Sequence, residues 1–204
     1  MTDPIQAIRS DLAFLKAVSE DRGPLPAQFG EHLLAIGLIY GLDFILIWGL
    51  FAGLVPRLTG DPWMLVSWLP ATILYVPINL LISRRAPGAV GPSARVFIAA
   101  WGAMALMIWA AVAVVIIASV RSGIPYYEVW PPIAFVLYGG AWSVAAIIRR
   151  ERWHWLVAMG CFAVALIAAA LVNSPGTWLV MSAGLLLLLA APGAAIMRQA
   201  RKPG

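Results

Sequence analysis

Residues 30–50 read GEHLLAIGLIYGLDFILIWGL, an almost unbroken apolar run with Glu31 and His32 at its start and Asp43 near its middle. A helix of about 20 mostly apolar residues crosses the ~30 Å hydrocarbon core of a bilayer. The run therefore predicts a transmembrane helix. It also raises the question of what an acidic side chain does at the centre of such a helix.

The composition of the whole chain favours a membrane protein. Of its 204 residues, 62% are hydrophobic and 11% are charged, whereas a soluble domain carries about 25% charged residues. The net charge of +5 does not indicate a nucleic-acid-binding protein, because the basic residues form short clusters between apolar runs. The single cysteine, Cys161, leaves no intrachain disulfide and no thiolate metal site.

Five further apolar stretches are long enough to cross a membrane. With the first, the predicted spans cover residues 32–55, 62–83, 96–120, 128–148, 153–173 and 177–197. We therefore expect an all-α polytopic membrane protein with a six-transmembrane-helix bundle over residues 31–197. Residues 1–30 are expected to form a cytoplasmic amphipathic helix and a linker, and residues 198–204 a short basic tail.

The distribution of Lys and Arg predicts the orientation, because cytoplasmic loops retain these residues. One side holds Arg9, Lys16, Arg22, Arg84, Arg85, Arg95, Arg149, Arg150, Arg152, Arg198, Arg201 and Lys202. The opposite side holds only Arg57 and Arg121. We therefore expect a multi-pass protein of the bacterial inner membrane with both termini in the cytoplasm.

The N-terminal segment predicts a helix that stands apart from the six spans. Asp3 and Pro4 are typical of a helix start, and Gly23 and Pro24 of a helix end. Between them, an apolar stripe at three- and four-residue spacing consists of Ile5, Ile8, Leu12, Leu15 and Val18. Such a helix can lie on the membrane surface, pack beneath the bundle or bind a protein partner. Its mixed charge argues against a polybasic lipid-binding helix.

Asp43 is the first candidate functional residue. A charged side chain at mid-membrane depth costs ~2.5 to 3.5 kcal/mol on insertion scales, so such a residue marks a candidate ion or substrate pathway. No Lys or Arg lies at a comparable depth, and we expect Tyr138 or Trp109 to donate a hydrogen bond to it, with Thr72 also near its depth. His32 lies about 20° from Asp43 around the helix. It either extends a polar path or is an interfacial residue, and Asp43 either handles protons or joins two helices.

Glycines and prolines predict helix packing and helix kinks. Small residues that permit close helix approach are Gly37, Gly41, Gly49 and Gly53 in the first span and Gly139 and Gly140 in the fourth. Prolines that remove helical hydrogen bonds are Pro70 and Pro77 in the second span and Pro192 in the sixth. Kinked helices mark substrate sites in many transporters, but plain kinks are also common in membranes.

Motifs for catalysis, metal binding or cofactors are missing from the sequence. The serines in the spans have no histidine at their depth. His32 and His154 lie on different helices and could ligate haem, or join Glu31 and Glu151 at a metal, but no HExxH or CxxCH spacing supports either site. We therefore expect no cofactor, no metal and no enzymatic activity.

Three short motifs resemble a group of known proteins. They are DLAFLKAVSEDRG before the first span, YGGAW in the fourth and APG near the end of the sixth. In these motifs the chain resembles small six-span inner-membrane proteins of alphaproteobacteria. The resemblance implies the same fold and location, and it brings no activity and no catalytic residue with it.

Two functional hypotheses follow from the sequence. The first is an integral inner-membrane protein that acts as a subunit, regulator or sensor through a membrane or cytoplasmic partner. The alternative is a small transporter or channel, proton-coupled through Asp43. The expected partners are the lipid bilayer, a protein at the N-terminal helix and a second copy of the chain, and nucleic acid is not among them.

Overall fold

The computed structural model describes residues 4–21, 23, 25–54, 63–85, 91–124, 126 and 129–201. All regular elements in these residues are helices. They are α1 (Pro4–Glu20), α2 (Ala27–Phe51), α3 (Trp63–Ser83), α4 (Pro92–Ser122), α5 (Trp130–Arg149), α6 (Arg152–Ala170), α7 (Gly176–Leu185), the π-helical turn η1 (Leu186–Ala190) and α8 (Ala191–Ala200).

The predicted all-α polytopic membrane fold is confirmed. Within the described residues, five helices are long and apolar enough to cross a membrane: α2, α4, α5, α6 and the continuous segment Gly176–Ala200, which contains α7, η1 and α8. The remaining predicted span, residues 62–83, corresponds to α3, of which Pro70–Ser83 forms a shorter apolar helix by the same criteria.

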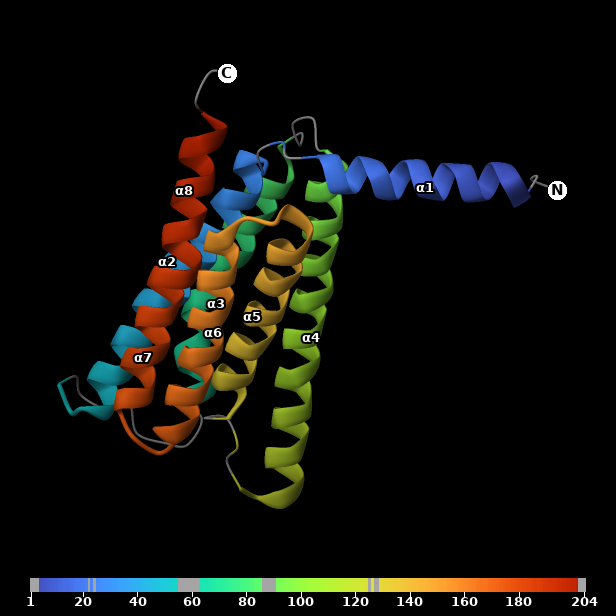
Figure 1. The fold of residues 1–204 in the computed structure, drawn as a ribbon. Coiled ribbons are helices and arrows are strands. Elements are labelled where there is room, and N and C mark those ends of the chain that lie inside the picture. Colours follow the sequence, from blue (N-terminus) through green and yellow to red (C-terminus); the bar gives the residue numbers. More distant parts are fainter. Residues whose placement is uncertain are drawn as a thin grey trace.

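The helices form an elongated bundle from which α1 projects sideways (Figure 1). The end of α8 lies at the same end of the bundle as α1, which we call the α1 end. Contacts of α1 with the bundle are made with α4 and α5. Most described side chains of α1 are exposed, including Ile8, Leu12 and Leu15 from the predicted stripe.

Helix α2 packs tightly against the C-terminal segment through glycines. A Cβ added at Gly37 would lie 2.7 Å from the Cβ of Ala190, and one added at Gly30 would lie 2.7 Å from the carbonyl oxygen of Gly193. Side chains at these positions would hold the helices apart, so close approach requires glycine. Gly30 and Gly193 extend the predicted set. Gly41 and Gly139 also lie at close contacts, and Gly49 is buried.

Two of the glycines predicted to pack against other helices have open space beside them. Gly53 lies beyond the end of α2, with a φ of 75° and open space around the position of a Cβ. It therefore belongs to the turn that ends α2, since glycine adopts positive φ without strain. Gly140 is exposed, and a Cβ there would meet nothing within 4 Å.

The three prolines predicted to kink helices have different surroundings. Pro70 and Pro77 lie on exposed positions of α3, which continues as one helix through both. Pro192 is buried at the start of α8, directly after the π-helical turn η1. Because proline has no backbone N–H, it removes the donor to the carbonyl of Leu188. The wider turn thus occurs where regular α-helical bonding is interrupted.

Aromatic side chains fill the core at the α1 end. Trp142 is fully buried, and its ring lies 5.5 Å from that of Trp101, 5.5 Å from that of Trp153 and 5.9 Å from that of Phe97, between ring centroids. These edge-on and tilted contacts are the geometries that aromatic pairs prefer. They bring α4, α5 and α6 together as one packed unit.

Candidate functional site: a cleft between two helix pairs

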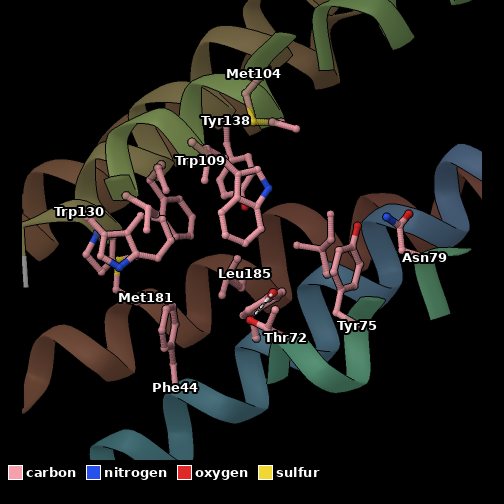
Figure 2. Close-up of a pocket in the computed structure, with 18 residues that line it drawn as sticks. Phe44, Thr72, Tyr75, Asn79, Met104, Trp109, Trp130, Tyr138, Met181 and Leu185 are labelled. Atoms are coloured by element: carbon pink, nitrogen blue, oxygen red, sulfur yellow. Dashed lines mark hydrogen bonds between the residues drawn. The ribbon is translucent and has the colours of Figure 1, made fainter. Parts of the chain in front are cut away.

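A cavity of about 240 Å³ lies between two pairs of helices. Helix α3 packs on α2 and α4 packs on α5, whereas the described parts of α3 and α4 make little contact with each other. The lining residues come from both pairs and from α7. We call this cavity the cleft, with an α2–α3 wall and an α4–α5 wall, and Figure 2 shows its side chains.

The α2–α3 wall is built from residues at helical spacing. Helix α2 contributes Ile36, Tyr40 and Phe44, and α3 contributes Thr72, Tyr75 and Asn79. Residues three or four positions apart share one face of a helix, so each helix turns one continuous face to the cleft. The hydroxyl oxygens of Tyr40 and Thr72 lie 3.3 Å apart, and the ring centroids of Tyr40 and Tyr75 are 5.8 Å apart.

Four of the ten side chains that α4 and α5 contribute to the cleft are aromatic. Trp109 comes from α4, and Phe135 and Tyr138 come from α5. The Tyr138 ring stacks on Trp101 at 6.0 Å and meets the edge of Phe135 at 5.6 Å, between centroids. Figure 2 shows Tyr138 and Trp109 across the cavity from Thr72 and Tyr75. Trp109 is 60% exposed and so lies at the rim.

The cleft is suited to a neutral molecule that is partly aromatic. Seven of its 18 lining residues are aromatic, and none of the 18 carries a charge. Among the described residues, the hydroxyls of Tyr75 and Tyr138 have no hydrogen-bond partner. A mostly apolar cavity with a few convergent polar groups is the usual form of a small-molecule site.

Asp43 lies close to Tyr40 on α2 but is not one of the lining residues of the cleft. It is 8% exposed, and its Oδ2 atom has no hydrogen-bond partner among the described residues. Neither Tyr138 nor Trp109 hydrogen-bonds to Asp43, so the partners predicted for it are wrong. Depth alone suggested them, whereas both side chains belong to the opposite wall of the cleft.

The two histidines occupy separate environments. His32 is half-buried near the start of α2 and does not line the cleft. His154 is fully buried, with its ring stacked on Trp153 at 3.8 Å and its Nδ1 atom 3.6 Å from Glu151 Oε2. No group of three or more potential metal ligands occurs within the described part of the chain.

A polar junction ties the end of α1 to α4 and α5. The Asp21 carboxylate accepts hydrogen bonds from the Gly23 N–H at 2.9 Å and from the Ser93 N–H and hydroxyl, both at 3.0 Å. Arg149 Nη2 donates to the Gly23 carbonyl at 2.9 Å and to Glu151 at 3.2 Å. Asp21 thus provides a hydrogen-bond acceptor to the first turn of α4, where backbone N–H groups lack helical partners. The same helices form the α4–α5 wall.

The structure brings together some of the predicted pathway residues and adds others. Thr72, Trp109 and Tyr138 all line the cleft, whereas Asp43 and His32 do not. Tyr40, Tyr75 and Asn79 are lining residues that the sequence prediction does not contain. The positions of Thr72, Tyr75 and Asn79 at i, i+3 and i+7 form a polar face on an otherwise apolar helix. That pattern is the sequence signal for this wall.

No protein-family model, curated protein or solved structure matches this chain.

Proposed function

We propose that the protein is a non-enzymatic, membrane-embedded sensor or regulatory subunit. Its cleft takes up a neutral, lipid-soluble molecule from the bilayer, and α1 transmits occupancy of the cleft to a protein partner. The observation that carries this proposal is the uncharged, aromatic cleft between the α2–α3 wall and the α4–α5 wall.

Entry from the bilayer follows from the surroundings of the cleft. The outer faces of α3 and α4 expose large apolar side chains, including Ile73, Leu74, Leu106 and Val114. In a membrane such faces contact acyl chains. A molecule dissolved in the bilayer therefore reaches the rim at Trp109 without crossing water.

The connection to α1 gives the cleft a route to the membrane surface. One wall of the cleft, α4 and α5, is also the pair that holds the end of α1 through Ser93 and Arg149. Among the described residues, no hydrogen bond of this junction involves α2 or α3. A ligand that changes the spacing of the walls therefore moves α1 relative to α2 and α3, which is the kind of two-state coupling that a sensor needs.

A protein partner is proposed for α1 because of where its apolar side chains lie. Leu12 and Phe14 are 61% and 53% exposed, and they lie about 200° apart around the helix. A lipid surface covers only one face of such a helix. Charges of both signs, on Arg9, Asp11 and Lys16, also fit a protein surface better than an anionic lipid surface.

Photolabelling tests the binding proposal. A diazirine-bearing fatty alcohol is expected to label cleft residues such as Ile108 saturably. Leu156 and Leu166, on the exposed face of α6, should instead be labelled in proportion to the concentration of the probe. Ala105→Trp is expected to abolish the saturable labelling, because Ala105 lines the cleft. Ala110→Trp, at an exposed position of α4 that does not line the cleft, is the matched control. Equal, non-saturable labelling at all these sites contradicts the proposal.

Co-purification tests the partner. We expect a stoichiometric protein to remain with the chain in mild detergent, to be lost with Leu12→Glu and to be kept with Gln6→Glu, a change at another exposed position of α1. Absence of such a protein, or equal recovery with both variants, contradicts this part of the proposal. A second copy of the chain is the partner if the recovered mass is that of a homodimer.

Location and orientation are part of the same proposal. We propose a multi-pass protein of the bacterial inner membrane with the α1 end in the cytoplasm, supported by the distribution of Lys and Arg. Fluorescent-protein fusions at either terminus are expected to be bright, and alkaline phosphatase fusions at those positions inactive. Active phosphatase at either end overturns the orientation.

Proton-coupled transport is the second candidate function. The observation in its favour is Asp43, buried within an apolar helix with its Oδ2 atom unpartnered among the described residues. Buried acids in membranes commonly serve proton or ion movement. Proton flux in proteoliposomes that is abolished by Asp43→Asn supports this candidate. Flux that is unchanged by the substitution removes Asp43 from the pathway.

A further inference from the structure

We infer that the ligand of the cleft is a quinone-type molecule: a neutral, planar ring with carbonyl oxygens at two opposite positions and an alkyl or isoprenoid tail. This inference rests on the binding function proposed above and names the chemistry of its ligand. The placement of hydrogen-bond donors, the shape and size of the cleft and the absence of charge in its described lining support it.

Hydrogen-bond donors face the cleft from both of its walls. Thr72 and Tyr75 lie on the α2–α3 wall, and Tyr138 and the Trp109 indole lie opposite them (Figure 2). A ligand that uses both sets needs an acceptor at each of its ends. A quinone has two such acceptors on one rigid ring, whereas a fatty alcohol or a sterol has a single polar group.

The remaining lining favours a flat ring. Phe44 and Phe135 join the tyrosines and tryptophans in giving the cleft aromatic faces and edges. Aromatic rings pack against one another in offset-stacked or edge-on arrangements that add ~0.5 to 1.5 kcal/mol beyond simple burial. A saturated chain gains only the burial contribution at the same place.

The size of the cleft indicates which part of the ligand is enclosed. At about 240 Å³ it is smaller than the ~300 to 1,000 Å³ of sites that enclose a whole drug-sized molecule. It therefore holds one substituted ring, and the tail extends past the exposed Trp109 into the bilayer.

Charged ligands are disfavoured by the same residues. No described lining residue is acidic, basic or a histidine. Transfer of an uncompensated ion into such surroundings is far more costly than transfer of a neutral polar group. Fatty-acid anions and phospholipid headgroups are thereby excluded as occupants, and a neutral ring with carbonyl acceptors is retained.

Competition against the diazirine-bearing fatty alcohol tests the inference in the full-length protein. The competitors are decylbenzoquinone and decylbenzene, which share a ring and a tail and differ in the two carbonyl oxygens. We expect decylbenzoquinone to displace the probe from the cleft at a concentration at least tenfold lower than decylbenzene. Labelling at Leu156 and Leu166 should not change, which controls for absorption of light by the quinone.

Variants assign the effect to the two walls. Tyr138→Phe and Thr72→Val each remove a hydroxyl and keep the side-chain shape, and each is expected to weaken competition by decylbenzoquinone about 2- to 10-fold, the usual effect of one hydrogen bond. Competition by decylbenzene should not change. Tyr126→Phe, which removes a hydroxyl outside the cleft, is the matched control.

The outcomes separate the inference from the proposed function. Equal competition by the two compounds, or variants without effect, overturns the quinone-type ligand. Saturable labelling of the cleft that neither compound displaces overturns it too and leaves the binding function standing. Failure of the probe to label the cleft saturably overturns both.

Discussion

The hydroxyl oxygens of Tyr40 and Thr72 lie 3.3 Å apart and join α2 to α3 within the wall of the cleft. Both side chains line the cavity between the two helix pairs. The α2–α3 pair is therefore held both by apolar packing and by a polar contact at the site itself. A change in either hydroxyl is expected to affect the wall and not the rest of the bundle.

The Tyr40–Thr72 contact is testable by a double-mutant cycle. For Tyr40→Phe and Thr72→Val we expect a coupling free energy of about 0.6 kcal/mol, the average for hydrogen bonds between membrane helices. The measurement is the free energy of unfolding in mixed micelles. The pair Tyr126→Phe and Thr72→Val is the control. Its coupling should be near zero, because Tyr126 lies outside the cleft.

Gly37 is expected to tolerate no side chain. Because an added Cβ would lie 2.7 Å from the Cβ of Ala190, Gly37→Leu should destabilise the fold by ~1 to 3 kcal/mol, the usual cost of overpacking. Gly140→Leu, where a Cβ meets nothing within 4 Å, should change stability little. Cys161 is fully buried, so its rate of alkylation by a maleimide reports opening of the bundle in both variants. Equal rates in the two variants contradict the tight contact.

The junction at Asp21 should be sensitive to acid. The Gly23 N–H, and after it the Ser93 N–H and hydroxyl, hold the pKa of Asp21 below its ordinary value of 3.8. The stabilisation is therefore complete above that value and is lost as the pH falls through the lower pKa of the folded protein. The distribution of distances between spin labels at positions 6 and 110, in a Cys161→Ala background, should broaden below about pH 4.

Substitutions at Asp21 check the cause of that effect. Asp21→Ala should show broad distances even at neutral pH, because the first turn of α4 loses its cap, worth ~0.5 to 2 kcal/mol. Asp21→Asn should keep narrow distances at neutral pH and lose the acid transition, since asparagine also caps helices. Broadening that begins above pH 5 would point to another group.

Glu151 is expected to contribute more to stability than a partly exposed side chain usually does. Its carboxylate accepts hydrogen bonds from Arg149, whose side chain is 5% exposed, and from the Trp153 indole. Removal of one partner of a buried ion pair typically costs ~3 to 5 kcal/mol, and solvent at Glu151 reduces that figure. Glu151→Ala should therefore lower the Tm more than Arg149→Met, which removes the buried charge. The opposite order would show that Arg149 acts mainly through the Gly23 carbonyl.

The length of the apolar runs was sufficient to predict the helical, polytopic fold. The spans predicted for residues 62–83 and 128–148 agree with α3 and α5 to within two residues at each end. Helix α2 begins earlier than the span predicted for it, at Ala27, because it starts directly after Pro26 and includes the polar residues that precede the apolar run. Hydropathy detects the buried part of a helix and not its polar extension.

The cleft was only partly predictable, for a geometrical reason. Depth along a span can be counted from its ends, and this count grouped Thr72, Trp109 and Tyr138, all of which line the cleft. The rotation of each helix and the choice of neighbours are set by tertiary packing, such as the Gly37–Ala190 contact. Asp43, which the same count grouped with them, does not line the cleft.

The length of α4 has a consequence for Arg121. Its 31 residues extend about 46 Å, and even a 40° tilt leaves about 35 Å along the membrane normal, more than the ~30 Å of hydrocarbon. The helix must overhang the acyl layer. Under the orientation proposed above, Arg121 in the last turn of α4 lies at the end opposite the α1 end, where an overhang into the headgroup layer removes the cost of burying its charge.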